Sequence, residues 1–311
     1  MAVYVNTNYS ALQGQRYLGN VQNQLTTTYQ RLSSGMRINS AKDDAAGLQI
    51  ADRLTSQING LNQGNRNASD GIALAQTAEA GMDEISGMLQ KIRTLAVQAS
   101  NGTNTLEDRK SLSKEASALA TEITRIAKQT TFAGKTILNG KQDNSINPTT
   151  GNAGDAQSVT LQVGSNKGDT IAFTLVNFHF SVAASKAGVL KDAVGDTKAD
   201  DKAFVTDGTT VSVNFSTVGR AADIINYMDQ MIGYVDGQRA DLGAIQNRLE
   251  SSIRNQSNVA ANEADARSRI RDADFAEESA NLSQQSIIQQ AAASMLMQAN
   301  TRPQLGLSLL G

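Results

Sequence analysis

Apolar side chains recur at helical spacing over most of the chain. Near the amino terminus they step by three and four residues, at Leu18, Val21, Leu25, Thr28 and Leu32. A second region of this kind, near the other end, contains Leu282, Ile288, Ala292 and Met295. This spacing places side chains on one face of a helix. Both ends are therefore predicted to be helices with a narrow apolar seam, as in a coiled coil.

Longer helices are predicted between these ends. The first covers about fifty residues, or roughly 75 Å at the rise of an α-helix, and stops at the turn formed by residues 101–104. Its stripe consists of Ala51, Leu54, Ile58, Leu61, Ala68, Ile72, Ala75, Ala78, Ile85, Leu89, Ile92 and Ala96. A returning helix carries Leu112, Ala116, Leu119, Ile123 and Ile126, and a further long helix carries Ile225, Met228, Ile232, Val235, Leu242, Ile245, Leu249 and Ile253. We predict a mainly α fold, a long antiparallel helical rod or coiled-coil bundle built from both ends of the chain.

The middle of the chain has a different period. Val159, Leu161 and Val163 alternate with polar residues, as do Ile171, Phe173 and Leu175, and a glycine-containing segment separates the two runs. This pattern predicts a β-hairpin. Five of the seven phenylalanines lie between positions 173 and 215, which indicates a small aromatic core of its own. Because Gly154-Asp155 and residues 192–201 are polar and rich in turn formers, we predict that residues 141–219 are a variable, surface-exposed, β-containing region.

Charge is nearly balanced overall but is missing from both ends. With 28 Lys and Arg against 30 Asp and Glu, the chain has no field that would attract nucleic acid or an anionic membrane. Residues 1–30 contain one charged side chain, Arg16, and residues 279–301 contain none. No apolar run reaches the ~18 residues needed to span a bilayer, and the amino terminus does not resemble a secretory signal peptide. We expect no membrane insertion. Either the protein stays inside the cell, or a machinery that does not read a secretory signal peptide exports it.

The seams at the two ends are diluted by Gln, Asn and Thr. An isolated helix of this composition buries little surface against an ordering cost of ~1–2 kcal/mol per residue. We therefore expect residues 1–44 and 267–311 to be disordered in the monomer and to fold on assembly.

Candidate catalytic groups are few. The chain has no Cys and a single His, His179, which excludes thiol nucleophiles, disulfides, an HExxH zinc helix and a His-based metal cluster. Gly134-Lys135-Thr136 ends like a phosphate-binding loop, but Gln129 stands where that motif requires Gly. Asp272, Asp274, Glu277 and Glu278 could hold a cation, although carboxylates are also favoured where a helix begins. We predict no enzyme activity, no cofactor and no metal site.

Several long segments resemble bacterial flagellin, the subunit of the flagellar filament. They are Arg31 to Gly47, Arg66 to Ile72, Leu89 to Gln98, Gly243 to Leu249, Ile270 to Ala276, and the tail from Gln289 to Leu310. The resemblance covers roughly residues 1–140 and 220–311. The middle resembles no family that we can name.

The resemblance implies a secreted structural subunit that polymerises into the filament used for swimming. Residues 1–44 with 267–311 would form an inner tube, and residues 45–140 with 220–266 a helical rod domain. The chain would be exported unfolded and assembled at the filament tip. Implied partners are other copies of the chain, a flagellar export chaperone, the type III flagellar export apparatus, the filament cap and the hook–filament junction proteins.

The resemblance also implies two sets of contact residues. The expected subunit-interface set is Arg31, Arg37, Lys42, Asp43, Leu282, Ile288 and Leu296. Locally, residues 33–47 can equally be a helix connection, with Gly35 at a positive φ and Asp43 or Asp44 capping the next helix. A vertebrate Toll-like receptor recognises related flagellins at positions matching Lys91, Arg93, Leu95, Gln98 and Glu115. The other interpretation is that Ile92 and Leu95 are simply packed in the bundle.

Two other functions and one covalent modification are compatible with parts of the sequence. A hook–filament junction protein shares the terminal pattern, but the match of the carboxy-terminal tail favours the filament subunit. A cytoplasmic chemoreceptor-type signalling rod also uses long Ala- and Gln-rich heptads, and it predicts a stable bundle without polymerisation. Asn101-Gly102-Thr103 and Asn214-Phe215-Ser216 match the short N-glycosylation pattern, while Ser and Thr of the middle region are better candidates for O-glycosylation.

Overall fold

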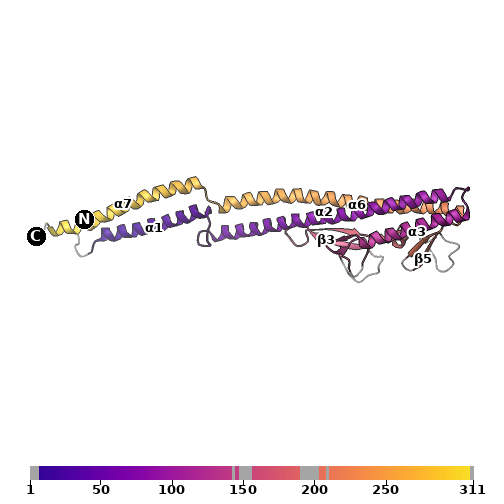
Figure 1. The fold of residues 1–311 in the computed structure, drawn as a ribbon. Coiled ribbons are helices and arrows are strands. Elements are labelled where there is room, and N and C mark those ends of the chain that lie inside the picture. Colours follow the sequence, from indigo (N-terminus) through magenta and orange to yellow (C-terminus); the bar gives the residue numbers. More distant parts are fainter. Residues whose placement is uncertain (1–6, 142–143, 147–155, 190–202, 208–209, 309–311) are drawn as a thin grey trace. The chain divides into compact units, whose positions relative to one another are not determined.

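The computed structural model describes residues 7–141, 144–146, 156–189, 203–207 and 210–308. Its helices are α1 (Tyr9–Ser34), α2 (Ala45–Ala99), α3 (Leu106–Gln129), α4 (Phe180–Lys186), α6 (Val218–Arg271) and α7 (Phe275–Ser308). The prediction of a mainly α fold is confirmed (Figure 1). Within the described residues, no helix is long and apolar enough to cross a membrane.

The chain divides into two compact units. Residues 1–59 and 259–311 form one, called here the terminal unit, and residues 60–258 form the other, called the central unit. Because the division falls inside α2 and α6, both helices contribute residues to each unit.

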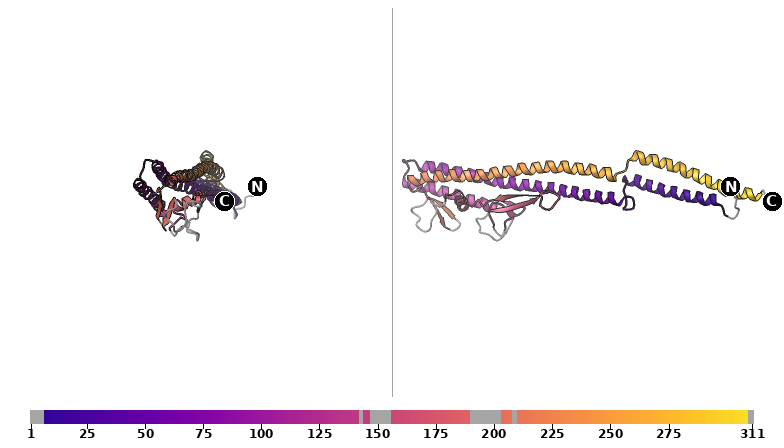
Figure 2. Two further views of the ribbon diagram at one scale, coloured as in Figure 1. Left: turned by 90° about the vertical axis from the view of Figure 1, so that its right-hand side faces the viewer. Right: turned by 180° about the vertical axis from the view of Figure 1, so that it is seen from behind.

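In the terminal unit, α1 and α7 lie side by side (Figures 1 and 2). They are antiparallel, since Asn8 contacts Ala299 whereas Arg31 contacts Glu278. The α1 seam predicted from the sequence is confirmed, with Val21 and Thr28 buried at 4% exposure each. The predicted α7 stripe is wrong at Met295, which is 71% exposed, while Ala292 is buried. The stripe continues four residues beyond Ala292, at Leu296, which lies against Gly14.

The central unit is organised by α2, α3 and α6. Gln246 donates a hydrogen bond to Glu79, and Arg93 pairs with Asp229, so α2 and α6 are antiparallel. Helix α3 begins where the sequence predicts, because Thr105 and Asp108 form a reciprocal capping box after the turn at residues 101–104. Most members of the predicted stripes are buried, including Leu89, Ile92, Ile123, Met228, Val235 and Leu249.

Strands in the described residues form three antiparallel two-stranded sheets. They pair β1 (Thr131–Phe132) with β2 (Lys135–Thr136), β3 (Gln157–Gln162) with β4 (Thr170–Leu175), and β5 (Phe204–Asp207) with β6 (Thr210–Val213). The predicted hairpin is β3–β4, in which Val159 lies opposite Phe173. Residues 154–155 and 192–201, predicted to be polar surface, lie outside the described residues.

The aromatic side chains do not form a core of their own. Phe178, Phe180, Phe204 and Phe215 are at most 1% exposed. They belong to the same buried cluster as the stripes of α2, α3 and α6. The reason is that a two-stranded hairpin cannot bury its own apolar face and needs a helix to cover it.

Glycines allow the β3–β4 hairpin to approach α2 closely. A Cβ atom at Gly64 would lie 2.0 Å from the carbonyl oxygen of Val163, and one at Gly71 would lie 2.2 Å from Leu161. The side-chain amide of Asn67 donates a hydrogen bond to the carbonyl of Gln162, at 2.8 Å. The hairpin is therefore held on a helix surface that tolerates no larger residue at these points.

Candidate assembly surface

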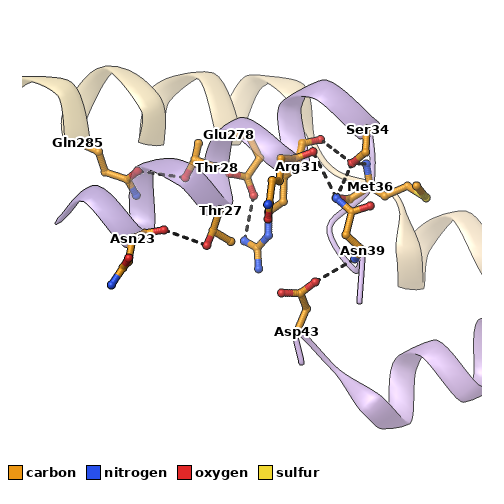
Figure 3. Close-up of polar contacts among 11 residues, drawn as sticks. Asn23, Thr27, Thr28, Arg31, Ser34, Met36, Asn39, Asp43, Glu278 and Gln285 are labelled. Atoms are coloured by element: carbon orange, nitrogen blue, oxygen red, sulfur yellow. Dashed lines mark hydrogen bonds and ion pairs between the residues drawn. The ribbon is translucent and has the colours of Figure 1, made fainter. Parts of the chain in front are cut away.

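Polar contacts fix the register of α1 against α7 (Figure 3). Arg31 Nη1 lies 3.1 Å from Glu278 Oε1, and the two side chains are 32% and 9% exposed. One helical turn away, the Thr28 hydroxyl donates to Gln285 Oε1 at 3.1 Å. At the far end of the pair, the Asn8 amide donates to the carbonyl of Ala299 at 2.7 Å. Because these pairs lie at both ends of the seam, sliding one helix by a turn would break all of them.

The segment between α1 and α2 is a capped connection, as the local interpretation predicts. Gly35 ends α1 with φ at 71°. The Asp43 carboxylate accepts hydrogen bonds from the backbone N–H groups of Ser40 (2.9 Å) and Asn39 (3.1 Å). These bonds, aided by the nearby Arg31 guanidinium, hold the pKa of Asp43 below its usual value. Asp44 accepts from Gly47 N–H at 2.9 Å, which caps the start of α2.

This connection is bonded to the junction between α6 and α7. The N–H of Arg37 donates to the carbonyl of Arg271 at 2.7 Å, and the N–H of Ala273 donates to the carbonyl of Gly35 at 3.0 Å. The guanidinium of Arg37 adds a bond to the carbonyl of Ile270 at 2.8 Å. The two junctions are thus held together by main-chain contacts.

Several of the expected interface residues make contacts inside the chain. Arg31 and Arg37 bond to Glu278 and Ile270, and Asp43 bonds to its own loop. Leu296 packs on Gly14, and Leu282 and Ile288 are partly buried. Lys42 is exposed. Contact of these residues with a second subunit stays a prediction.

Most of the large apolar side chains left exposed in this unit lie on α1 and α7, and they are different residues. On α1 they are Tyr9, Leu12, Tyr17 and Tyr29, and on α7 they are Phe275, Ile287, Met295 and Met297. An open groove of about 650 Å³ lies between the two helices, lined in part by Tyr17, Ile288 and Met295. Sequence reasoning missed most of these residues because it sought the seam. The available signal was large apolar residues lying off the seam in segments almost without charge.

The two units differ sharply in where their apolar side chains lie. Of thirteen exposed large hydrophobic residues in the described part of the chain, ten belong to the terminal unit. Both clusters of contacting buried hydrophobic residues lie in the central unit. Exposed apolar surface of this extent marks an interaction site. The terminal unit therefore has the exposed apolar residues expected of an interaction surface.

The candidate catalytic motifs have structural roles. Gly134 lies with Ala133 in the tight turn between β1 and β2, where their φ angles are 78° and 49°, and Lys135 and Thr136 form β2 itself. Two positive φ angles are what a type I′ hairpin turn requires. Asp274 accepts from the N–H of Ala276 at 2.8 Å and so caps α7. Among the described residues, no three His, Asp or Glu side chains are grouped so as to hold a metal ion.

His179 is half-buried beside Asn139, with which its Nε2 makes a hydrogen bond. Burial, and to a lesser extent the charge of Lys128, lower the pKa of this imidazole. His179 directly precedes α4, and its side chain makes no capping hydrogen bond to that helix.

The residues matched to receptor recognition lie on α2 and α3 of the central unit. Lys91, Gln98 and Glu115 are exposed. Arg93 donates to both carboxylate oxygens of Asp229, at 2.6 and 3.3 Å, and Asp229 raises the pKa of Arg93. Leu95 is 8% exposed and belongs to the buried cluster together with Ile92. Packing in the bundle thus accounts for Leu95, and its contact with a receptor stays a prediction.

Long amphipathic helices that leave apolar side chains unpaired at both ends of the chain define a helical structural subunit built to associate. The model of the bacterial flagellin N-terminal helical region matches residues 5–143, and that of the C-terminal helical region matches residues 225–310. The chain is 37% identical to flagellin A of Vibrio cholerae and 35% identical to polar flagellin C of Vibrio parahaemolyticus, in each case over the full length of both chains. The chain belongs to the bacterial flagellin family.

A solved structure, of a putative flagellar hook-associated protein from Vibrio parahaemolyticus, has a TM-score of 0.53 at 14% identity. The aligned region covers 74% of this chain and 100% of the hook-associated protein chain. At this identity the likeness concerns the fold alone.

Flagellins are structural filament proteins and not enzymes, and the family implies self-polymerisation into an extracellular flagellar filament. The chain is accordingly a filament subunit. Full-length similarity to flagellins favours this function over a junction protein, and family membership favours it over a cytoplasmic signalling rod.

Proposed function

We propose that copies of this chain build the filament by covering one another's exposed apolar side chains on α1 and α7. The observation that carries the proposal is the concentration of such side chains in the terminal unit, where Tyr9, Ile287 and Met295 are 74%, 67% and 71% exposed. Burying one such side chain contributes about 1.5–3 kcal/mol. Several in each subunit would offset the entropy lost on association.

The same feature supports assembly-coupled folding of residues 1–44 and 267–311. The fully buried side chains of the seam between α1 and α7 are small or polar, namely Val21, Thr28 and Ala292, and its larger apolar side chains are only partly buried. Such a seam is too thin to hold a helix pair in water by itself. We expect the two segments to be disordered in a free monomer and ordered in the filament.

This scheme fits export before assembly. Disordered stretches with almost no charge, such as residues 1–30 and 279–301, can pass through a narrow channel without strong ion pairing to its walls. The type III flagellar export apparatus would carry the chain, and a flagellar export chaperone would cover α7 beforehand. The filament cap and the hook–filament junction proteins would receive it. Recognition by a vertebrate Toll-like receptor, through Lys91, Arg93, Leu95, Gln98 and Glu115, would be incidental to this role.

Substitution of exposed residues tests the assembly surface. Ile287→Asp places a charge on α7 without entering the seam, so the fold should survive while filaments fail to grow from seeds. Val218→Asp is the matched control, because Val218 is also exposed, at 41%, but lies in the central unit. Electron microscopy and sedimentation measure polymer. Filaments of normal yield from Ile287→Asp would contradict the proposal.

Truncation tests the role of the terminal segments. A chain of residues 45–266 should stay monomeric where the full chain polymerises. Circular dichroism of the free full chain should show less helix than the filament does. Equal helicity in monomer and polymer would contradict assembly-coupled folding. The proposed contact surface would then be tested by Ile287→Asp alone.

A further inference from the structure

Sulfur chemistry in this chain rests on methionine alone. The sequence has eight Met and no Cys. Among the described methionines, exposure separates a buried group from an exposed group, with Met36 and Met88 partly buried between them. Met82, Met228 and Met231 are at most 1% exposed in the central unit, whereas Met295 and Met297 of α7 are 71% and 70% exposed. Oxidation of a thioether requires access of the oxidant to sulfur.

The two exposed methionines lie on the surface proposed for assembly. Both fall within residues 279–301, which contain no charged side chain. Met295 lines the groove between α1 and α7 together with Tyr17 and Ile288. The flexible, polarisable Met side chain suits such an adaptable apolar contact.

We propose that Met295 and Met297 form a peroxide-sensitive modification site that controls whether the subunit can assemble. The sulfur attacks one oxygen of hydrogen peroxide, the O–O bond breaks and an S–O bond forms. Sulfur loses two electrons, and the peroxide is reduced to water. The product, methionine sulfoxide, returns to methionine when a methionine sulfoxide reductase removes the oxygen. This inference rests on the proposed function, since it requires that the two side chains be covered in the filament.

The sulfoxide acts through polarity. Its oxygen is a strong hydrogen-bond acceptor, and the apolar side chains around it in the contact offer no donor. One unsatisfied group of this kind corresponds to a rise of about tenfold in the concentration needed for polymerisation. A subunit already in the filament is protected, because its neighbours cover the sulfur. The site would thus exclude oxidised subunits from growth without dissolving finished filaments.

The test uses the full-length chain and hydrogen peroxide. Peptide mapping by mass spectrometry should find sulfoxide first at Met295 and Met297, and last at Met82, Met228 and Met231. Seeded polymerisation of the oxidised chain should require about tenfold more protein than the untreated chain. The double variant Met295→Leu/Met297→Leu conserves volume and apolarity, and it should polymerise equally well before and after peroxide. Met36→Leu is the matched control and should remain sensitive, because it removes another methionine of the terminal unit and leaves Met295 and Met297 in place.

Each other outcome has a definite meaning. Sulfoxide at Met295 and Met297 with unchanged polymerisation would overturn the inference, as would loss of polymerisation in the peroxide-treated double variant. If the double variant fails to polymerise untreated, reductase treatment of the oxidised natural chain decides, and absence of recovery would overturn the inference. Failure of the untreated natural chain to polymerise would instead contradict the proposed function.

Discussion

Arg93 of α2 and Asp229 of α6 form a two-point ion pair in which Arg93 Nε lies 2.6 Å from Asp229 Oδ1. The side chains are 43% and 51% exposed, so water screens the pair and its contribution to stability is small. The pair mainly holds the Arg93 guanidinium, which the family resemblance matches to receptor recognition, in one orientation. The neighbouring Leu95 is buried.

Arg93→Ala should therefore lower receptor activation by about tenfold, the loss typical of one important interface side chain, with almost no change in melting temperature. Leu95→Ala should behave differently and lower the free energy of unfolding by about 2–4 kcal/mol, because Leu95 is a core residue. Reporter-cell activation and thermal unfolding measure the two effects. Full activation by Arg93→Ala would exclude Arg93 from the receptor contact.

Gly64→Ala should detach the β3–β4 hairpin from α2. The added Cβ would meet the carbonyl oxygen of Val163 at 2.0 Å, and main chain cannot give way as a side-chain tip can. We expect a loss of about 1–3 kcal/mol, as for other overpacked sites. Gly87→Ala is the control, because the space around Gly87 in the same helix is open, and it should stabilise the chain by about 0.5–1 kcal/mol. Urea unfolding of both variants gives the comparison, and equal effects would show that the hairpin does not rest on Gly64.

The Arg31–Glu278 pair should contribute to filament stability. Glu278→Ala leaves the partly buried Arg31 guanidinium without its partner, and such a charge is costly in a surface that assembly desolvates further. Filaments of this variant should dissociate at a lower temperature than those of Glu277→Ala, which removes an exposed carboxylate from the same first turn of α7. Heating filaments while following light scattering measures this. Equal dissociation temperatures would mean that the pair adds nothing.

Acid should weaken the connection between α1 and α2. Hydrogen bonds to the Asp43 carboxylate lower its pKa in the folded chain, so they stabilise the loop fully above the ordinary value near 3.9. That stabilisation is lost as pH falls through the lower folded pKa. An NMR titration of Asp43 should show a midpoint below that of a free aspartate, and Asp43→Asn should lack this part of the acid response. A midpoint at or above the ordinary value would contradict the loop geometry.

Local features of the fold could be predicted from the sequence. The helices follow from the recurrence of Val21, Ala68, Ile92 and Leu249 at helical spacing, and the hairpin follows from two alternating runs around glycines. Caps such as Thr105 with Asp108 are also local, since both residues lie within one turn.

Relations between distant residues could not be predicted in this way. The sequence around Gly64 does not predict its contact with Val163, and the sequence around Arg93 does not predict its ion pair with Asp229. Tertiary packing, and not sequence spacing, brings these residues together. The same limit explains the error at Met295. A three-residue step and a four-residue step from Ala292 are equally helical, and only contact with Gly14 selects Leu296. The expected interface residues came from family resemblance, whereas exposure is a property of the folded chain.

The main-chain bonds from Arg37 to Arg271 and from Ala273 to Gly35 join the α1–α2 connection to the α6–α7 junction. A bend between α1 and α2 cannot occur alone, because the crossing from α6 to α7 must turn with it. An inserted residue in one crossing would misalign its partner unless the other were lengthened as well. The geometry of each connection thus depends on that of the other.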